Sequence, residues 1–180
     1  MHPRTNPLLT RSKLESIEEI YKVNDKVLST LNDLIETSKD GERGFALASK
    51  DNREPGLTGM LKEGEESCRA AAAELQEQVR LLGGVAEDGA TVKATVHRGW
   101  ISVKAVMISR DSKSILEECE RGEDYAKTRY EDAMKLELPE PARMIVERQY
   151  QSVIATHGRV RDLRNRYPST EIPRAVRSNV

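Results

Sequence analysis

Residues 57–82 read LTGMLKEGEESCRAAAAELQEQVRLL and are followed by Gly83 and Gly84. Apolar side chains recur in this stretch at intervals of three and four, which is the spacing of one face of an α-helix. They are Leu57, Met60, Leu61, Cys68, Ala71, Ala72, Leu75, Val79 and Leu82. Two consecutive glycines are typical of the position just after a helix. The stretch therefore predicts a long amphipathic helix that ends near residue 82.

The segments on either side repeat this pattern and are separated by turn residues. Residues 27–49 predict a first helix, which ends at the polar turn 51–56 with its adjacent proline and glycine. Residues 12–23 either continue that helix backward or form a short separate one. Residues 92–107 predict a short connecting helix. Another long helix is expected to begin at Ser112 and end before Pro139, and the last spans 141–167.

Four long helices joined by two short links and one long link predict an all-α fold. A single long crossover between the second and third long helices, containing the short helix, is typical of a ferritin-like four-helix bundle. The 180 residues are expected to form one domain. We divide the chain into an N-terminal extension, 1–24, partly helical; the bundle, 25–167; and a flexible C-terminal tail, 168–180.

The composition excludes several classes of protein. One Phe and one Trp supply too little aromatic material for an all-β fold. The 29 basic and 30 acidic residues give a net charge of -1, which predicts no overall attraction to nucleic acid or to an anionic membrane. No apolar run is long enough to cross a bilayer. We therefore expect a cytoplasmic protein with no membrane partner.

Cysteines and two glycines give narrower predictions. Cys68 and Cys119 lie far apart in the sequence and form no metal-binding pair, so we expect two buried, reduced thiols. Gly44 and Gly122 fall inside helical patterns, where glycine lowers stability. Their presence predicts places where two helices approach closely.

Polar residues on the inward faces predict a candidate metal site. Equal residue counts from a shared turn give equal heights, because every helical residue rises by the same distance. By this count Glu42, Glu66, Glu118, Glu120 and His157 converge in one band of the bundle. Carboxylates and imidazole suit iron or manganese, so these five residues are the candidate ligands.

A second interpretation needs no metal. Arg43, Arg69 and Arg121 lie beside the same carboxylates and can neutralise them in a network of ion pairs. Di-iron bundles also carry Glu-x-x-His on two helices, whereas here Arg69 and Tyr150 occupy the histidine positions. Both interpretations stay open at this point.

Four short motifs resemble those of a known family. They are LNDLIE at 31–36, DGE at 40–42, HRGW at 97–100 and ECERGED at 118–124. They resemble a bacterial family of ferritin-like four-helix-bundle proteins classed as a domain of unknown function, over residues 25–167. The resemblance implies a stress-associated setting and no established reaction. It also implies a characteristic polar set of Glu42, Glu118, Glu120, Gly122 and His157.

These observations lead to one expected function and two alternatives. We expect a non-catalytic bundle without a cofactor that acts by self-association, as a homo-oligomer, or through a protein partner. The first alternative is a metal-binding protein or oxidoreductase with iron or manganese at the five candidate ligands. The second is DNA binding through basic ends that include Arg159 and Arg164; we expect no nucleic-acid partner, because the sequence has no base-reading motif. The segment around Trp100 either packs on the bundle or pairs two copies.

Overall fold

The computed structural model describes residues 11–50, 52, 54–88 and 112–167, and within them every regular element is an α-helix. The elements are α1 (Arg11–Lys50), α2 (Pro55–Leu81), α4 (Ser112–Met134) and α5 (Glu140–Arg166). The prediction of an all-helical bundle is confirmed. The predicted connecting helix at 92–107 and the predicted tail at 168–180 lie outside the described residues.

The ends of α2 lie where the turn residues predicted them. Pro55 occupies the first turn of the helix, where its missing N–H costs nothing. At the other end Gly83 adopts a φ of 77°, and the N–H groups of Gly83 and Gly84 donate to the carbonyls of Arg80 and Val79. A side chain at Gly84 would collide with Leu28 of α1, so glycine also permits close packing here.

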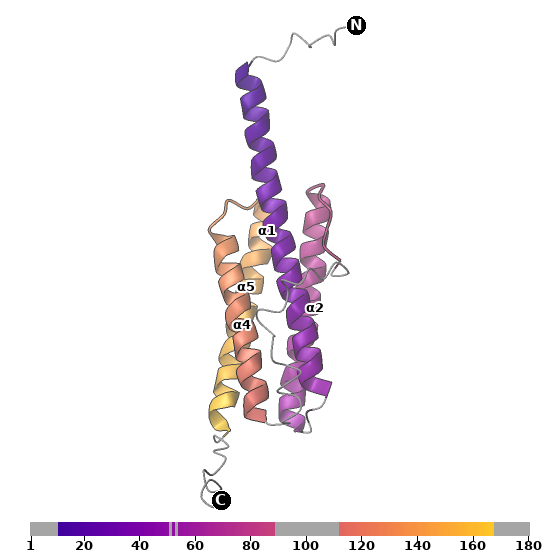
Figure 1. The fold of residues 1–180 in the computed structure, drawn as a ribbon, viewed down its shortest axis with the longest axis vertical. Helices are drawn as coiled ribbons and strands as arrows, with labels where there is room; N and C mark the ends of the chain where they lie inside the picture. The colour runs from indigo at the N-terminus through magenta and orange to yellow at the C-terminus, as the bar shows by residue number, and fades with distance from the viewer. Residues whose placement is uncertain (1–10, 51, 53, 89–111, 168–180) are drawn as a thin grey trace, which may run out of the picture.

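Each helix packs against two antiparallel neighbours. α1 lies between α2 and α4, and α5 contacts α4 and α2 (Figure 1). Arg69 of α2 reaches Glu42 of α1, Arg129 of α4 reaches Asp33 of α1, and Tyr130 reaches Gln149 of α5. The chain runs in the same direction along α2 and α4 (Figure 1), with residues 82–111 linking them.

The core consists of two apolar clusters at different heights. One contains Leu31, Ile35, Leu75, Val79, Tyr130 and Val146. The other contains Phe45, Leu57, Leu61, Leu116, Cys119 and Val160. Burial of each large apolar side chain contributes roughly 1.5–3 kcal/mol, so the two clusters hold the helices together. Along α1 and α4, the buried polar residues Thr37, Ser38 and Glu123 lie between the two clusters.

The first part of α1 extends past the ends of the other helices (Figure 1). The helix is continuous from Arg11, so residues 12–23 continue the first helix rather than forming a separate one. Among residues 19–50, Val27 is the first that is buried in the core. At about 1.5 Å per residue, the sixteen residues before Val27 make a projection of about 24 Å.

None of the described helices combines the length and the apolar character that a membrane-spanning helix needs.

Candidate functional site

Two of the five candidate ligands lie on the α1–α2 side of the bundle. Glu42 on α1 accepts a 2.8 Å hydrogen bond from Nε of Arg69, which also pairs with Glu65. Glu66 lies on α2 one turn before Arg69, but it is exposed. The counting of heights therefore places the two glutamates on the same level, while the rotation of α2 turns Glu66 towards solvent.

The other three candidate ligands lie on α4 and α5. Glu118 is buried, with 2% of its surface exposed, and forms an ion pair with Arg121. Glu120 forms an ion pair with Arg164 of α5. Nε2 of His157 lies 2.9 Å from a carboxylate oxygen of Asp124.

These contacts join the candidate ligands to other residues rather than to one another. Glu42, Glu118 and Glu120 each pair with an arginine, as the ion-pair interpretation predicts, although Arg164 rather than Arg43 or Arg121 neutralises Glu120. Arg43 pairs with Asp40. Among residues 11–50, 52, 54–88 and 112–167, no three His, Cys, Asp or Glu side chains are grouped so as to hold a metal ion. In this arrangement the five do not fit one ion, and metal binding stays a prediction.

Glu123 on α4 is a further buried acidic residue. Only 4% of its surface is exposed, and its Oε2 atom has no hydrogen-bond partner in the part of the chain that the structure describes. Burial, helped by the neighbouring charge of Asp124, raises the pKa of Glu123 to about 8. The carboxyl group therefore keeps its proton at neutral pH and can donate a hydrogen bond.

Sequence reasoning placed Glu123 in an acid-rich run but did not select it as a site residue. A signal was present: Glu123 follows Leu116 by seven residues and Cys119 by four, so it continues their buried stripe. Both cysteines lie close by. Burial, together with the charge of Glu123, raises the pKa of the Cys68 and Cys119 thiols, which keeps them protonated and unreactive.

A chain of hydrogen bonds crosses the bundle about two turns further along α4, at Tyr130. The Tyr130 hydroxyl donates to Oε1 of Gln149 at 2.9 Å and lies 3.2 Å from the Ser38 hydroxyl. The Gln149 amide donates to Glu74 at 2.8 Å, and Arg148 donates to both oxygens of that carboxylate at 3.0 Å. Burial raises the pKa of Glu74, but these hydrogen bonds outweigh it and leave the pKa lowered.

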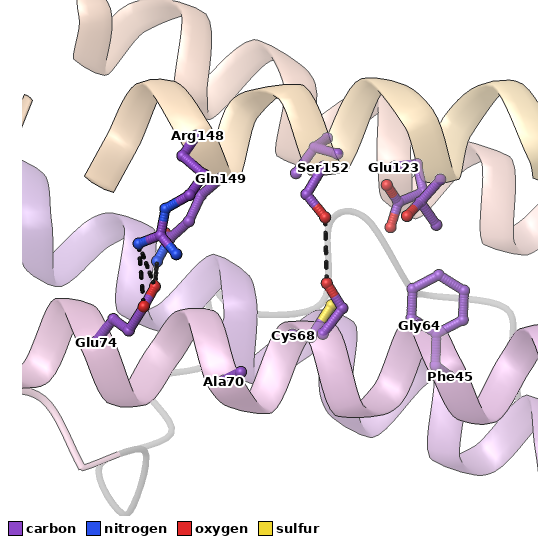
Figure 2. A pocket seen from close by; sticks show the side chains of 12 residues that line it. Phe45, Gly64, Cys68, Ala70, Glu74, Glu123, Arg148, Gln149 and Ser152 are labelled. Carbon is purple, nitrogen blue, oxygen red and sulfur yellow. Dashed lines mark hydrogen bonds and ion pairs between the residues drawn. The ribbon is translucent and has the colours of Figure 1, made fainter. Parts of the chain in front are cut away.

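A pocket of about 250 Å³ opens between α2 and α5, with Glu123 in its wall. Figure 2 shows Glu74, Arg148 and Gln149 at one end, and Glu123 with Phe45 and Gly64 at the other. Cys68 lies between them, where the Ser67 and Ser152 hydroxyls, 3.3 Å apart, join α2 to α5. Among the neighbouring helices α2 and α5 contact each other least, which leaves room for the pocket.

Glycines allow α1 to approach α2 beside this pocket. A Cβ atom at Gly41 would lie 2.7 Å from the Cys68 sulfur, and one at Gly64 would lie 3.0 Å from the Phe45 ring. Close approach therefore depends on Gly41 and Gly64. Gly44 and Gly122, at which the sequence predicted it, are both buried.

Comparison with known proteins identifies a family but no function. No curated protein matches the sequence. The model of one family matches residues 26–136, which include α1 from Lys26 onward, all of α2 and all of α4. The chain belongs to the family described as a domain of unknown function, DUF2383.

Proposed function

We propose that this protein is a ferritin-like helical bundle that acts without catalysis, by pairing with a second copy of itself through the projecting part of α1. A stress-associated setting, which the sequence resemblance implies, belongs to the same proposal. The long link between the parallel helices α2 and α4 supports the ferritin-like assignment. The arginine partners of Glu42, Glu118 and Glu120 support a non-catalytic role, because those ion pairs occupy the carboxylates that metal chemistry would need.

The observation that carries the proposal is an exposed apolar face on the projecting helix. Ile20, Tyr21 and Val23 are exposed over 68%, 67% and 54% of their surfaces. A single helix that is not packed against a partner is marginally stable in water, because its stability comes mainly from burying an apolar face. These side chains also line a groove of about 770 Å³, closed on the other side by Leu138 and Pro139 at the α4–α5 turn. A second helix would bury this face.

The charges beside this face favour a second copy of α1 in the antiparallel direction. Glu19 and Lys22 flank Ile20 and Tyr21 symmetrically. A two-fold axis between Ile20 and Tyr21 would therefore bring Glu19 of each copy opposite Lys22 of the other. The same surface is complementary to itself, as a closed dimer requires.

We expect the full chain to sediment with the mass of two chains at micromolar concentration. Ile20→Glu with Tyr21→Glu should give the mass of one chain, because four carboxylates would then be buried at the interface. Both residues lie outside the core, so the variant should keep its helical content by circular dichroism. Ile154→Glu is the control, since Ile154 is 38% exposed and lies about four turns along α5 from the groove at Pro139.

A charge swap tests the antiparallel register. Glu19→Lys and Lys22→Glu should each weaken the dimer, because each brings like charges together. The double variant should restore it, and the two single variants should form a heterodimer when mixed. A wild-type chain that stays monomeric, or a dimer that none of these changes affects, would remove the proposed pairing.

The rival function is iron or manganese binding, and one observation favours it: Glu123 offers a buried carboxyl oxygen without a partner. Glu42, Glu118, Glu120 and His157 would have to leave their present partners to join it, and Glu66 would have to turn inward from solvent. Metal analysis of the full chain, after loading with Fe(II) or Mn(II) and gel filtration, decides between the two functions. We expect no retained metal; one ion per chain that is lost in a Glu42→Ala, His157→Ala variant would establish the rival function instead.

A further inference from the structure

The pocket between α2 and α5 has the size and lining of a small-molecule site. Its volume of about 250 Å³ exceeds that of a cavity known to hold benzene, which is about 150 Å³. Phe45, Ala70 and Val153 give it an apolar lining, and the hydroxyl residues Ser67, Ser152 and Thr156 also line it. Apolar walls with a few placed polar groups are typical of ligand sites.

One polar atom in this pocket is unsatisfied within the protein. Oε2 of Glu123 is buried and has no hydrogen-bond partner, while the Glu123 side chain lines the pocket wall. Leaving a buried polar group without a hydrogen bond is costly. A ligand in the pocket that accepts a hydrogen bond from the Glu123 carboxyl group would give the carboxyl proton a partner.

The charges around the pocket favour a neutral ligand. Arg148 is the cationic side chain that lines it, and it is paired with Glu74. Among the described residues that line the pocket, an anion would therefore meet no free positive charge. A cation would require Glu123 to lose its proton, which burial opposes.

From this geometry we propose that the pocket binds a small uncharged molecule with a flat apolar body and one hydrogen-bond acceptor. The apolar body lies among Phe45, Ala70 and Val153, and the acceptor receives a hydrogen bond from the Glu123 carboxyl group. This site is separate from the projecting face of α1, so it goes beyond the proposed dimer and its failure would not affect that proposal.

Benzamide is a suitable probe, with benzoate and benzylammonium as charged molecules of nearly the same size. We expect benzamide to shift the amide resonances of residues 64–74 and 148–156 of the full chain in a saturable way at pH 6.5. The charged analogues should bind about tenfold more weakly or worse, because the pocket offers them no counter-charge.

Variants locate the site. Ser152→Trp should fill the pocket and abolish binding, whereas Gln151→Trp puts the same side chain on the neighbouring exposed position and should leave binding intact. Glu123→Leu should weaken binding by about tenfold or more, because it removes the donor. Glu123→Gln keeps an N–H donor and should retain it.

The dependence on pH tests the role of the proton. The groups around Glu123 are Asp124, Cys119 and Tyr130 on α4, Cys68 on α2, Glu42 on α1 beyond Cys68, and His157 on α5 beyond Asp124. The ion pair of Glu74 and Arg148 lies at the far end of the pocket. With a pKa of about 8 for Glu123, benzamide binding by the wild-type chain should fall about thirty-fold between pH 6.5 and 9.5. Binding by Glu123→Gln should stay constant, since its donor does not titrate.

Three results of the benzamide experiments would overturn the proposal. They are no saturable benzamide binding by the folded wild-type chain, tighter binding of either charged analogue, and binding that survives Ser152→Trp. Retention of a divalent cation that Glu123→Gln abolishes would also overturn it, because the carboxyl group would then be an anionic ligand.

Discussion

At pH 8.5, Glu123→Gln is expected to raise the free energy of unfolding by roughly 3–5 kcal/mol, since each unit of pKa shift is worth about 1.4 kcal/mol. In the wild-type chain Glu123 has a pKa of about 8 when folded, against 4.5 for an unperturbed carboxyl group. Above pH 8 the folded protein must bury a carboxylate. The amide of glutamine has nearly the same shape and carries no charge at any pH, so the variant avoids this cost.

The sign of the effect follows from where the proton is held. Below pH 4.5 both the folded and the unfolded chain hold the Glu123 proton, and its contribution to stability is complete. As the pH rises from 4.5 to 8, the unfolded chain has released the proton while the folded chain keeps it, so the wild-type stability falls. The difference between variant and wild type should therefore grow over this interval and then level off.

Urea unfolding of both chains at several pH values measures this difference. Glu66→Gln is the matched control, because Glu66 is exposed. The difference in free energy of unfolding between Glu66→Gln and the wild-type chain should not change with pH. If the free energy of unfolding of the wild-type chain changed with pH in parallel with that of Glu123→Gln, this would contradict the burial of an ionisable carboxyl group. Taking differences between chains removes the contributions of all other titrating groups.

The fold was largely predictable because its signals are local. Spacings of three and four, Gly83 with Gly84, and Pro139 each act over a few residues, and they placed the described helices close to their observed bounds. Whether residues 12–23 continue the first helix could not be decided. No proline or glycine separates them from Val27, and an unpacked helix carries no pattern of burial that would show its continuity.

The candidate site was less predictable, because it depends on how each helix is rotated about its axis. Counting residues gives height, which is why Glu42 was correctly placed near Arg69. It does not give the direction in which a side chain points, because neighbouring residues of a helix point about 100° apart around its axis. Within the run 117–124, Glu117 and Asp124 are therefore exposed while Glu118 and Glu123 are buried. The pairing of Glu120 with Arg164, 44 residues away, likewise needs the α4–α5 packing.

Close packing of α1 on α2 predicts strong coupling between Gly41 and Cys68. In a chain that keeps Cys68, Gly41→Ala places a methyl group 2.7 Å from the Cys68 sulfur. Atoms this close must move apart. Overpacking of this kind costs about 1–3 kcal/mol and should outweigh the gain of about 1 kcal/mol that alanine gives inside a helix. Gly41→Ala alone should therefore lower the free energy of unfolding or leave it unchanged.

With Cys68→Ala the sulfur is gone, and the same Gly41→Ala change should stabilise the protein by about 1 kcal/mol. The double-mutant cycle should thus give a coupling energy of roughly 2 kcal/mol, measured by urea unfolding at pH 7. Gly59→Ala on α2 is the control, because apart from its chain neighbours and its own helical backbone no described atom lies within 4 Å of its added Cβ, and it should stabilise both backgrounds equally. Additive effects of Gly41→Ala and Cys68→Ala would mean that α1 does not rest on the Cys68 side chain. Cys68 also lines the pocket, so α1 would then not support the part of the pocket wall that Cys68 forms.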